Sequence, residues 1–138
     1  MRGGFQIIFD TNFLLLPFTE QVDILSQIEK ILSIKFIPAI LQSSIKELDN
    51  LKTKANPKLK KRIRLAKQLI KNFSVISDEE IKGKSFDEKI LTIVKIQDKR
   101  YIVATNDREL RKKLRDLGIP VIVFRIKDKR IYVEGEIL

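Results

Sequence analysis

Apolar residues follow two different spacings along the chain, and their alternation predicts the fold. Short continuous apolar runs predict buried strands, and segments with apolar residues every three or four positions predict amphipathic helices. The predicted strands are residues 6–9, 35–37, 74–76, 101–104, 121–126 and 131–133. The predicted helices are residues 20–32, 39–51, 57 to about 73, 85–97 and 107–117, with a loop at 78–84. This order predicts an α/β protein, a three-layer α/β/α sandwich around a mainly parallel sheet of about five strands.

Proline and polar residues provide the boundaries of these elements. Pro17 is predicted to interrupt the chain after the first strand, and Thr19 to cap the following helix. Pro38 is predicted to end the second strand. Asn56 followed by Pro57 has the form of a helix N-cap with proline in the first turn. The last strand, 131–133, is predicted to add antiparallel at the edge of the sheet.

The length of 138 residues indicates one domain, 1–138, with a core of its own. The sequence contains no cysteine, which gives no indication of a disulfide-bonded secreted protein. No apolar stretch reaches membrane-spanning length. We therefore expect a cytoplasmic protein without a membrane partner.

The chain is strongly basic. It has 28 basic and 18 acidic residues, a net charge of +10. This excess favours a polyanionic partner, with nucleic acid first, although a heat-adapted charged surface has a similar composition. Nine basic residues and no acidic ones occur between positions 52 and 71. The candidate RNA-binding residues are Lys58, Lys60, Lys61, Arg64, Lys67 and Lys71, with Arg111 and Lys112 in a second patch that continues to Lys113 and Arg115.

The helix beginning at Pro57 arranges Lys60, Arg64, Lys67 and Lys71 along one ridge. Such a ridge contacts phosphates without reading sequence, but a solvated helix face has the same pattern. Aromatic residues make up 7% of the chain, so base stacking is not a visible means of recognition.

Two predicted strands end on a carboxylate. Asp10 follows the strand at 6–9, and Asp107 follows the strand at 101–104 after Thr105 and Asn106. Carboxyl ends of parallel strands meet at one edge of a sheet, where ligands bind. Converging carboxylates need a cation, and oxygen ligands without any histidine or cysteine favour Mg²⁺ or Mn²⁺. Each aspartate taken alone is also a common turn or helix-cap residue.

Three further acids are candidates. Glu47 lies beside the apolar stripe of its predicted helix, although a solvated glutamate is the simpler interpretation of that position alone. Asp87 and Glu88 open the helix predicted at 85–97. Ser85 and Glu88 have the spacing of a capping box, which gives Glu88 a structural role. We favour Asp87 as the functional acid and keep Glu88 as its competitor.

The combined motifs resemble the PIN-domain nucleases. The resemblance rests on Asp10-Thr11-Asn12, Glu47-Leu48, Asp87 with Ile90, and the segment from Ile102 to Leu110 followed by Gly118 to Ile122. The resemblance covers nearly the whole chain. Within the family, the chain is similar both to VapC-type toxins and to the PIN endonucleases that process ribosomal RNA. One departure is Lys89, which stands where relatives carry a small residue if Glu88 is the aligned acid.

The resemblance implies a PIN-like fold and a Mg²⁺- or Mn²⁺-dependent endoribonuclease. Asp10, Asp87, Asp107 and Glu47 are then the catalytic and metal-binding residues, with Thr11, Asn12, Thr105 and Asn106 orienting them. The implied partners are RNA, a cognate antitoxin or ribosome-assembly factors, and a second copy of the chain. For the homodimer, Phe13, Phe18 and Ile24 are the predicted apolar patch. The alternative is a catalytically inactive module of the same fold that binds RNA or protein.

Overall fold

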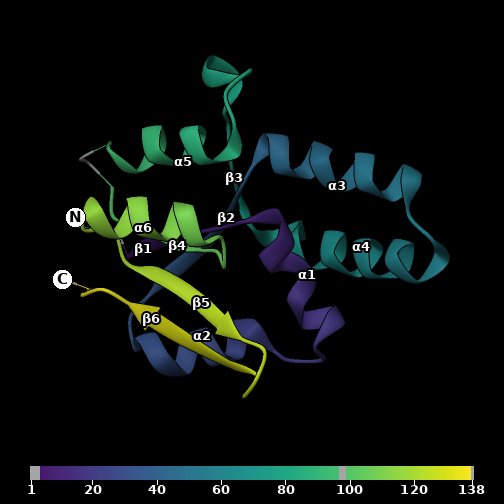
Figure 1. Ribbon diagram of the computed structural model, residues 1–138, viewed down its shortest axis with the longest axis horizontal. Helices are drawn as coiled ribbons and strands as arrows, with labels where there is room; N and C mark the ends of the chain where they lie inside the picture. The colour runs from purple at the N-terminus through teal and green to yellow at the C-terminus, as the bar shows by residue number, and fades with distance from the viewer. Residues whose placement is uncertain (1–3, 97–98, 138) are drawn as a thin grey trace.

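The computed structural model, which describes residues 4–96 and 99–137, is a six-stranded sheet between two layers of helices (Figure 1). The strands are β1 Phe5–Phe9, β2 Phe36–Leu41, β3 Ser74–Ile76, β4 Tyr101–Ala104, β5 Val121–Arg125 and β6 Arg130–Glu134. Their order is β3-β2-β1-β4-β5-β6. Neighbouring strands are parallel from β3 to β5, and β6 pairs antiparallel with β5. The predicted fold class and the antiparallel edge strand are confirmed.

Helices cover both faces of the sheet. The α-helices are α1 Thr11–Thr19, α2 Ile24–Leu32, α3 Gln42–Lys54, α4 Pro57–Leu69, α5 Phe86–Val94 and α6 Arg108–Asp116. Two short 3₁₀ segments are η1 Ile70–Asn72 and η2 Glu79–Ile81. In Figure 1, α3 and α4 form an antiparallel pair that projects past the carboxyl ends of the central strands. Of the helices in the described ranges, none is long and apolar enough to cross a membrane.

Two apolar clusters hold the three layers together. One cluster joins α1 to α4 to one face of the sheet, and its fully buried members include Phe9 of β1, Leu48 of α3 and Ile63 of α4. The other joins α5 and α6 to the opposite face and includes Ile90 and Leu110. Each fully buried side chain of this size stabilises the fold by roughly 1.5–3 kcal/mol. The packing therefore fixes both helix layers around the ends of β1 and β4.

The region between β1 and β2 differs from the prediction. Residues 11–19 form a helix that contains Pro17, whereas a break was expected there. The second helix begins at Ile24 with Asp23 as its N-cap, so the predicted start at residue 20 and the capping role of Thr19 are wrong. Asp10 starts α1 immediately after β1, and the buried Phe13 and Leu14 hold α1 against the core despite the proline.

The second strand also extends further than predicted. Pro38 lies inside β2, and the next helix begins at Gln42 rather than at residue 39. At Pro38 only β1 is a paired neighbour, because pairing with β3 begins at Ala39. A residue without an N–H is tolerated where one side of the strand is unpaired. The boundaries predicted for β3 and β4 and the start of α4 at Pro57 are confirmed. The helix predicted at 85–97 is shorter than expected, because α5 ends at Val94 with Lys95 as its C-cap; residue 97 itself lies outside the described residues.

Candidate active site

The strand order reverses between β1 and β4. From this point β2 and β3 lie to one side of β1, and β5 and β6 lie to the other side of β4. Gln6 to Phe9 of β1 pair with Tyr101 to Ala104 of β4, so the two strands end side by side. Each strand is followed by the first turn of a helix, α1 or α6. Such a switch point leaves a crevice outside the strand ends, where α/β proteins bind their ligands.

Asp10 lies in this crevice, between β1 and α1. It is the N-cap of α1 and accepts a hydrogen bond from the backbone N–H of Asn12 at 3.4 Å. Its Oδ2 atom accepts a second bond from Thr105 Oγ1 at 2.8 Å. Burial raises the pKa of Asp10, and the negative charges of Glu47 and Asp107 raise it further against the lowering effect of the two hydrogen bonds.

Thr105 connects the two strand-end acids. Its side chain is fully buried, and its hydroxyl accepts a hydrogen bond from the backbone N–H of Asp107 at 3.1 Å while donating to Asp10. Asp107 is the N-cap of α6 and accepts from Leu110 N–H at 2.9 Å. Asn106, between them, accepts from the N–H of Phe124 at 2.9 Å and so ties this turn to β5.

Glu47 reaches the site from α3. Its Oε1 atom accepts a hydrogen bond of 2.7 Å from Thr11 Oγ1, and Thr11 itself is buried. The neighbouring Leu48 is fully buried in the core, which fixes this turn of α3 against the sheet. The exposed glutamate is thereby held beside the first turn of α1, next to Asp10.

Asp87 and Glu88 have different environments at the start of α5. Burial raises the pKa of Asp87, and the charges of Asp107, Asp10 and Glu109 raise it further against the opposing effect of Lys113. Glu88 instead completes the capping box: its Oε1 accepts from Ser85 N–H at 3.0 Å, and its own N–H donates to Ser85 Oγ at 3.2 Å. The structure thus brings Asp87 into the electrostatic field of the strand-end acids and gives Glu88 a capping role.

The two strand-end aspartates, Asp10 and Asp107, border an open cleft of 270 Å³. Its lining comes from the first turns of α1 and α6 and consists of Asp10, Asn12, Phe13, Leu16, Asn106 and Asp107. Among the described residues, no three acidic side chains approach closely enough to ligate one ion together. The carboxylates are nevertheless close enough to raise one another's pKa. An all-oxygen set with few direct contacts fits Mg²⁺, which keeps several of its waters in protein sites.

A buried ion pair beside the site was not anticipated. Lys89 Nζ lies 3.0 Å from Asp78 Oδ2, and Ser43 donates a short hydrogen bond to the same oxygen. Burial alone would raise the pKa of Asp78, but the bonds from Ser43 and Lys89 outweigh it and lower the pKa. The available signal was the spacing of Phe86, Lys89 and Ile93, which places the lysine on the inner face of α5.

The basic candidates divide into engaged and unengaged side chains. Lys67 forms an ion pair with Asp49 of α3. Arg111 donates to both carboxylate oxygens of Glu134, at 3.3 and 2.5 Å. The exposed candidates without an ion pair in the described part of the chain are Lys58, Lys60, Lys61, Arg64, Lys71 and Lys112.

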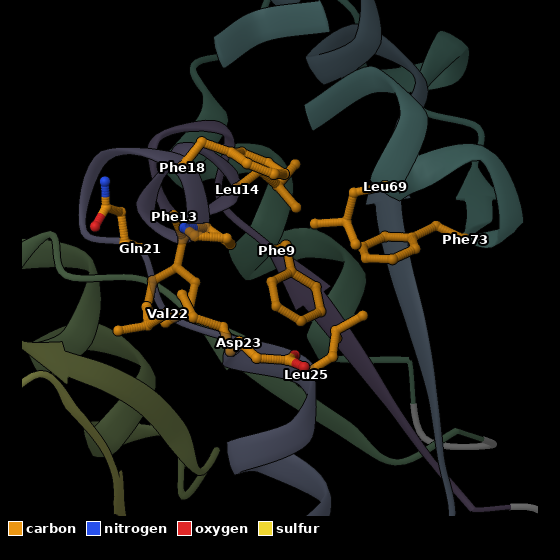
Figure 2. A pocket seen from close by; sticks show the side chains of 12 residues that line it. Phe9, Phe13, Leu14, Phe18, Gln21, Val22, Asp23, Leu25, Leu69 and Phe73 are labelled. Atoms are coloured by element: carbon orange, nitrogen blue, oxygen red, sulfur yellow. The ribbon is translucent and has the colours of Figure 1, made fainter. Parts of the chain in front are cut away.

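An apolar cavity of 320 Å³ lies between α1, α2 and the end of α4, as Figure 2 shows. Phe9, Phe13, Phe18 and Phe73 contribute aromatic side chains to its wall. Phe13 and Ile24, at 2% and 3% exposure, belong to the core. They are therefore not available for the self-complementary surface patch that was predicted from the sequence.

Comparisons with known proteins agree with this fold and arrangement. The sequence matches the family described as PIN like domain over residues 7–127. Ribonuclease VapC4 of Methanocaldococcus jannaschii is 36% identical over 89% of this chain and 92% of its own length. The rRNA-processing protein FCF1 of Saccharomyces cerevisiae is 33% identical over 88% of this chain but 61% of its own length. The structure of the PIN domain endonuclease Utp24 superimposes with a TM-score of 0.76 and 28% identity, covering 96% of this chain and 92% of that chain.

Proposed function

Since this chain belongs to the PIN-domain family, we propose that it is a Mg²⁺- or Mn²⁺-dependent endoribonuclease that hydrolyses RNA phosphodiester bonds. The observation that carries the proposal is the junction of Asp10 and Asp107 at the adjacent ends of β1 and β4, bridged by the Thr105 hydroxyl. The similarity to a ribonuclease along nearly the full length of both proteins supports it.

In this proposal Asp10 and Asp107 hold the ion, and Glu47 and Asp87 orient its waters. When bound, a divalent ion supplies a more acidic water and neutralises charge on the phosphate. Thr105 holds the Asp10 carboxylate by donating to Oδ2, and Thr11 holds Glu47 in the same way. Asn106 fixes the turn between Thr105 and Asp107 by accepting from β5. These contacts set the direction of the carboxylates before RNA arrives.

The unengaged lysines and arginine of α4 bind the RNA backbone in the proposed complex. They are exposed on the helix pair that projects past the strand ends (Figure 1). Two cellular roles are consistent with the relatives, a toxin restrained by an antitoxin and a nuclease that processes ribosomal RNA with assembly factors. Induced expression in a bacterial host separates them, since a free toxin arrests growth and its Asp10→Asn variant does not.

The decisive experiment compares Asp10→Asn with a matched control, Asp116→Asn. Asparagine keeps one of the two oxygens that accept from Asn12 N–H at Oδ1 and from Thr105 at Oδ2, and it removes the charge. We expect Asp10→Asn to lose cleavage of single-stranded RNA in Mn²⁺ while remaining folded. Asp116 is exposed at the far end of α6, so its variant should cleave like the wild type. Unaltered cleavage by purified Asp10→Asn would exclude Asp10 as a ligand.

A catalytically inactive binding module of the same fold is the alternative function. Calorimetric titration of Mn²⁺ into the intact protein distinguishes the two, because the proposed enzyme binds the ion and the Asp10→Asn variant binds it more weakly. Absence of any Mn²⁺ binding together with RNA binding would favour the inactive module.

We also propose a homodimer, using exposed apolar residues other than Phe13 and Ile24. Ile31, Ile34 and Ile37 are 46%, 38% and 48% exposed and lie near the junction of α2 with β2. Sedimentation velocity at micromolar concentration is the test, and a single monomeric species would contradict the dimer.

A further inference from the structure

The hairpin between β5 and β6 carries a second concentration of positive charge. Residues 125–130 read Arg-Ile-Lys-Asp-Lys-Arg, with four basic side chains and one acid. All six residues are exposed. This segment is separate from the basic helix α4, which packs on α1 and α3.

Arg125 and Arg130 stand directly opposite each other across the two strands. Like charges at opposed positions of an antiparallel pair destabilise a sheet. In the described part of the chain neither arginine forms an ion pair with an acid. The Asp128 carboxylate in the turn offsets part of this repulsion through its attraction to Arg125, and an anionic ligand relieves the remainder on binding.

Arg125 is already positioned for such a ligand. Its guanidinium carbon lies 4.0 Å from the centre of the Tyr132 ring. Tyr132 is fixed in turn, because its hydroxyl donates to Asp128 Oδ2 at 2.5 Å. Stacking on a ring restrains the guanidinium without using its N–H groups, so these donors stay available for a planar contact with phosphate.

The hairpin is held in place relative to the site. Phe124, immediately before Arg125, donates its N–H to Asn106, the neighbour of Asp107. On the other side Gln27 of α2 donates to the carbonyl of Lys129 at 3.2 Å and accepts from Ile131 N–H at 2.9 Å. The arginine pair therefore lies at the carboxyl end of β5, the strand next to β4, on the side of β4 away from β1.

We propose that Arg125 and Arg130 form a second phosphate-binding surface for the RNA backbone, so that the substrate crosses the acidic cleft between α4 and the β5–β6 hairpin. This inference rests on the proposed function for the identity of its ligand. It extends that function by assigning the path of the strand and a binding element outside the basic helix.

The test is a comparison of Arg125→Gln/Arg130→Gln with the control Lys35→Gln/Lys95→Gln. The control removes the same charge from two exposed lysines at the amino edge of the sheet, away from the cleft. Affinity for a fluorescent single-stranded RNA is measured in EDTA across a salt series, so binding is measured without cleavage. Single-strand contacts contribute about 0.7 units of salt slope each, so the double arginine variant should lose about 1.4 units relative to the control.

A third variant, Arg125→Lys/Arg130→Lys, distinguishes the loss of charge from a disturbance of the hairpin fold. It should retain the wild-type salt slope while losing part of the affinity, because lysine keeps the charge but not the stacked, planar contact. An arginine-to-glutamine variant with the same affinity and slope as the control would overturn the proposal and leave the pair to an acidic protein partner. A wild type that binds RNA but never cleaves it with Mn²⁺ would instead refute the proposed function and not this surface.

Discussion

Replacing Thr105 by valine tests the geometry of the site without touching an acid. Valine has nearly the same shape, so the fully buried position stays filled. The change removes one hydroxyl that donates to Asp10 at 2.8 Å and accepts from Asp107 N–H at 3.1 Å. Both candidate ligands therefore lose a restraint at once.

The size of the effect follows from these two bonds. Valine leaves the backbone N–H of Asp107 without its acceptor, and a buried donor without a partner costs about 1–3 kcal/mol of folding stability. Loss of a residue that orients a metal ligand typically lowers metal affinity or activity by about 10–100-fold. That range corresponds to about 1.4–2.7 kcal/mol of lost transition-state stabilisation. We expect Thr105→Val to fold, to unfold at lower urea concentration, and to cleave RNA at a rate reduced within this range.

The pH dependence gives a second readout. Burial raises the pKa of Asp10, and the Thr105 hydrogen bond opposes this rise, so the valine variant raises the pKa further. Only the ionised carboxylate holds a cation. Activity is therefore lost on acidification as the pH falls through the Asp10 pKa, and this loss should occur at higher pH in the variant.

The control is Thr105→Ser, which keeps the hydroxyl. Cleavage rate against pH, measured at saturating RNA and at a fixed Mn²⁺ concentration below saturation, compares the two variants, because saturating metal would displace the proton from Asp10. Equal rates and the same acidic limb in Thr105→Val and Thr105→Ser would refute the bridging role of the hydroxyl.

Three other outcomes are expected. The pKa of Asp10 is raised in the folded protein, so its negative charge opposes folding at neutral pH. Asp10→Asn should therefore raise the thermal unfolding midpoint at neutral pH, and this gain should vanish below the unfolded pKa near 3.8. A constant gain at all pH values would contradict this. Lys89→Met should destabilise the fold by about 3–5 kcal/mol in urea, because it leaves Asp78 buried without its cation, whereas Lys95→Met at the exposed end of α5 should change little. Charge reversal at Lys60, Arg64 and Lys67 should weaken RNA binding but spare cleavage at saturating RNA. The salt slope should fall by about 1.4 units if Lys67 stays paired with Asp49 in the wild-type complex with RNA, and by about 2.1 units if Lys67 contacts a phosphate instead. Unchanged affinity and slope would mean that the ridge is a solubilising surface.

The parts of the fold that sequence patterns predicted are those in which local and tertiary preferences agree. The strand at 101–104 is a continuous apolar run, and α4 has both an N-cap at Asn56 and a first-turn proline. The segment after β1 was mispredicted because the local rule for Pro17 disagrees with the tertiary packing of Phe13 and Leu14. Packing determined the outcome, as it did for Pro38 in β2.

The candidate site also combines features that sequence patterns predict with contacts that they do not. Parallel pairing accounts for Asp10 and Asp107 at the same edge of the sheet, whereas the direct pairing of β1 with β4 comes from the strand order of the fold. The role of Ser85 with Glu88 follows from a spacing of three residues. The contacts of Lys67 and Arg111 with Asp49 and Glu134 join distant segments, and no local pattern contains that information. The Asp78–Lys89 pair depends in the same way on how α5 meets the end of β3.

Both strand-end aspartates are also helix N-caps, and this has a consequence for how relatives of this protein change over evolutionary time. Substitutions at positions 10 and 107 are limited first by their effect on helix stability. Alanine or a branched aliphatic residue at an N-cap lowers the folding stability by about 0.5–2 kcal/mol. Asparagine and serine satisfy the same backbone N–H groups without a charge. A lineage released from selection for cleavage should therefore accumulate asparagine or serine at these two positions and keep its fold, whereas positions 47 and 87, which cap no helix, should vary more widely.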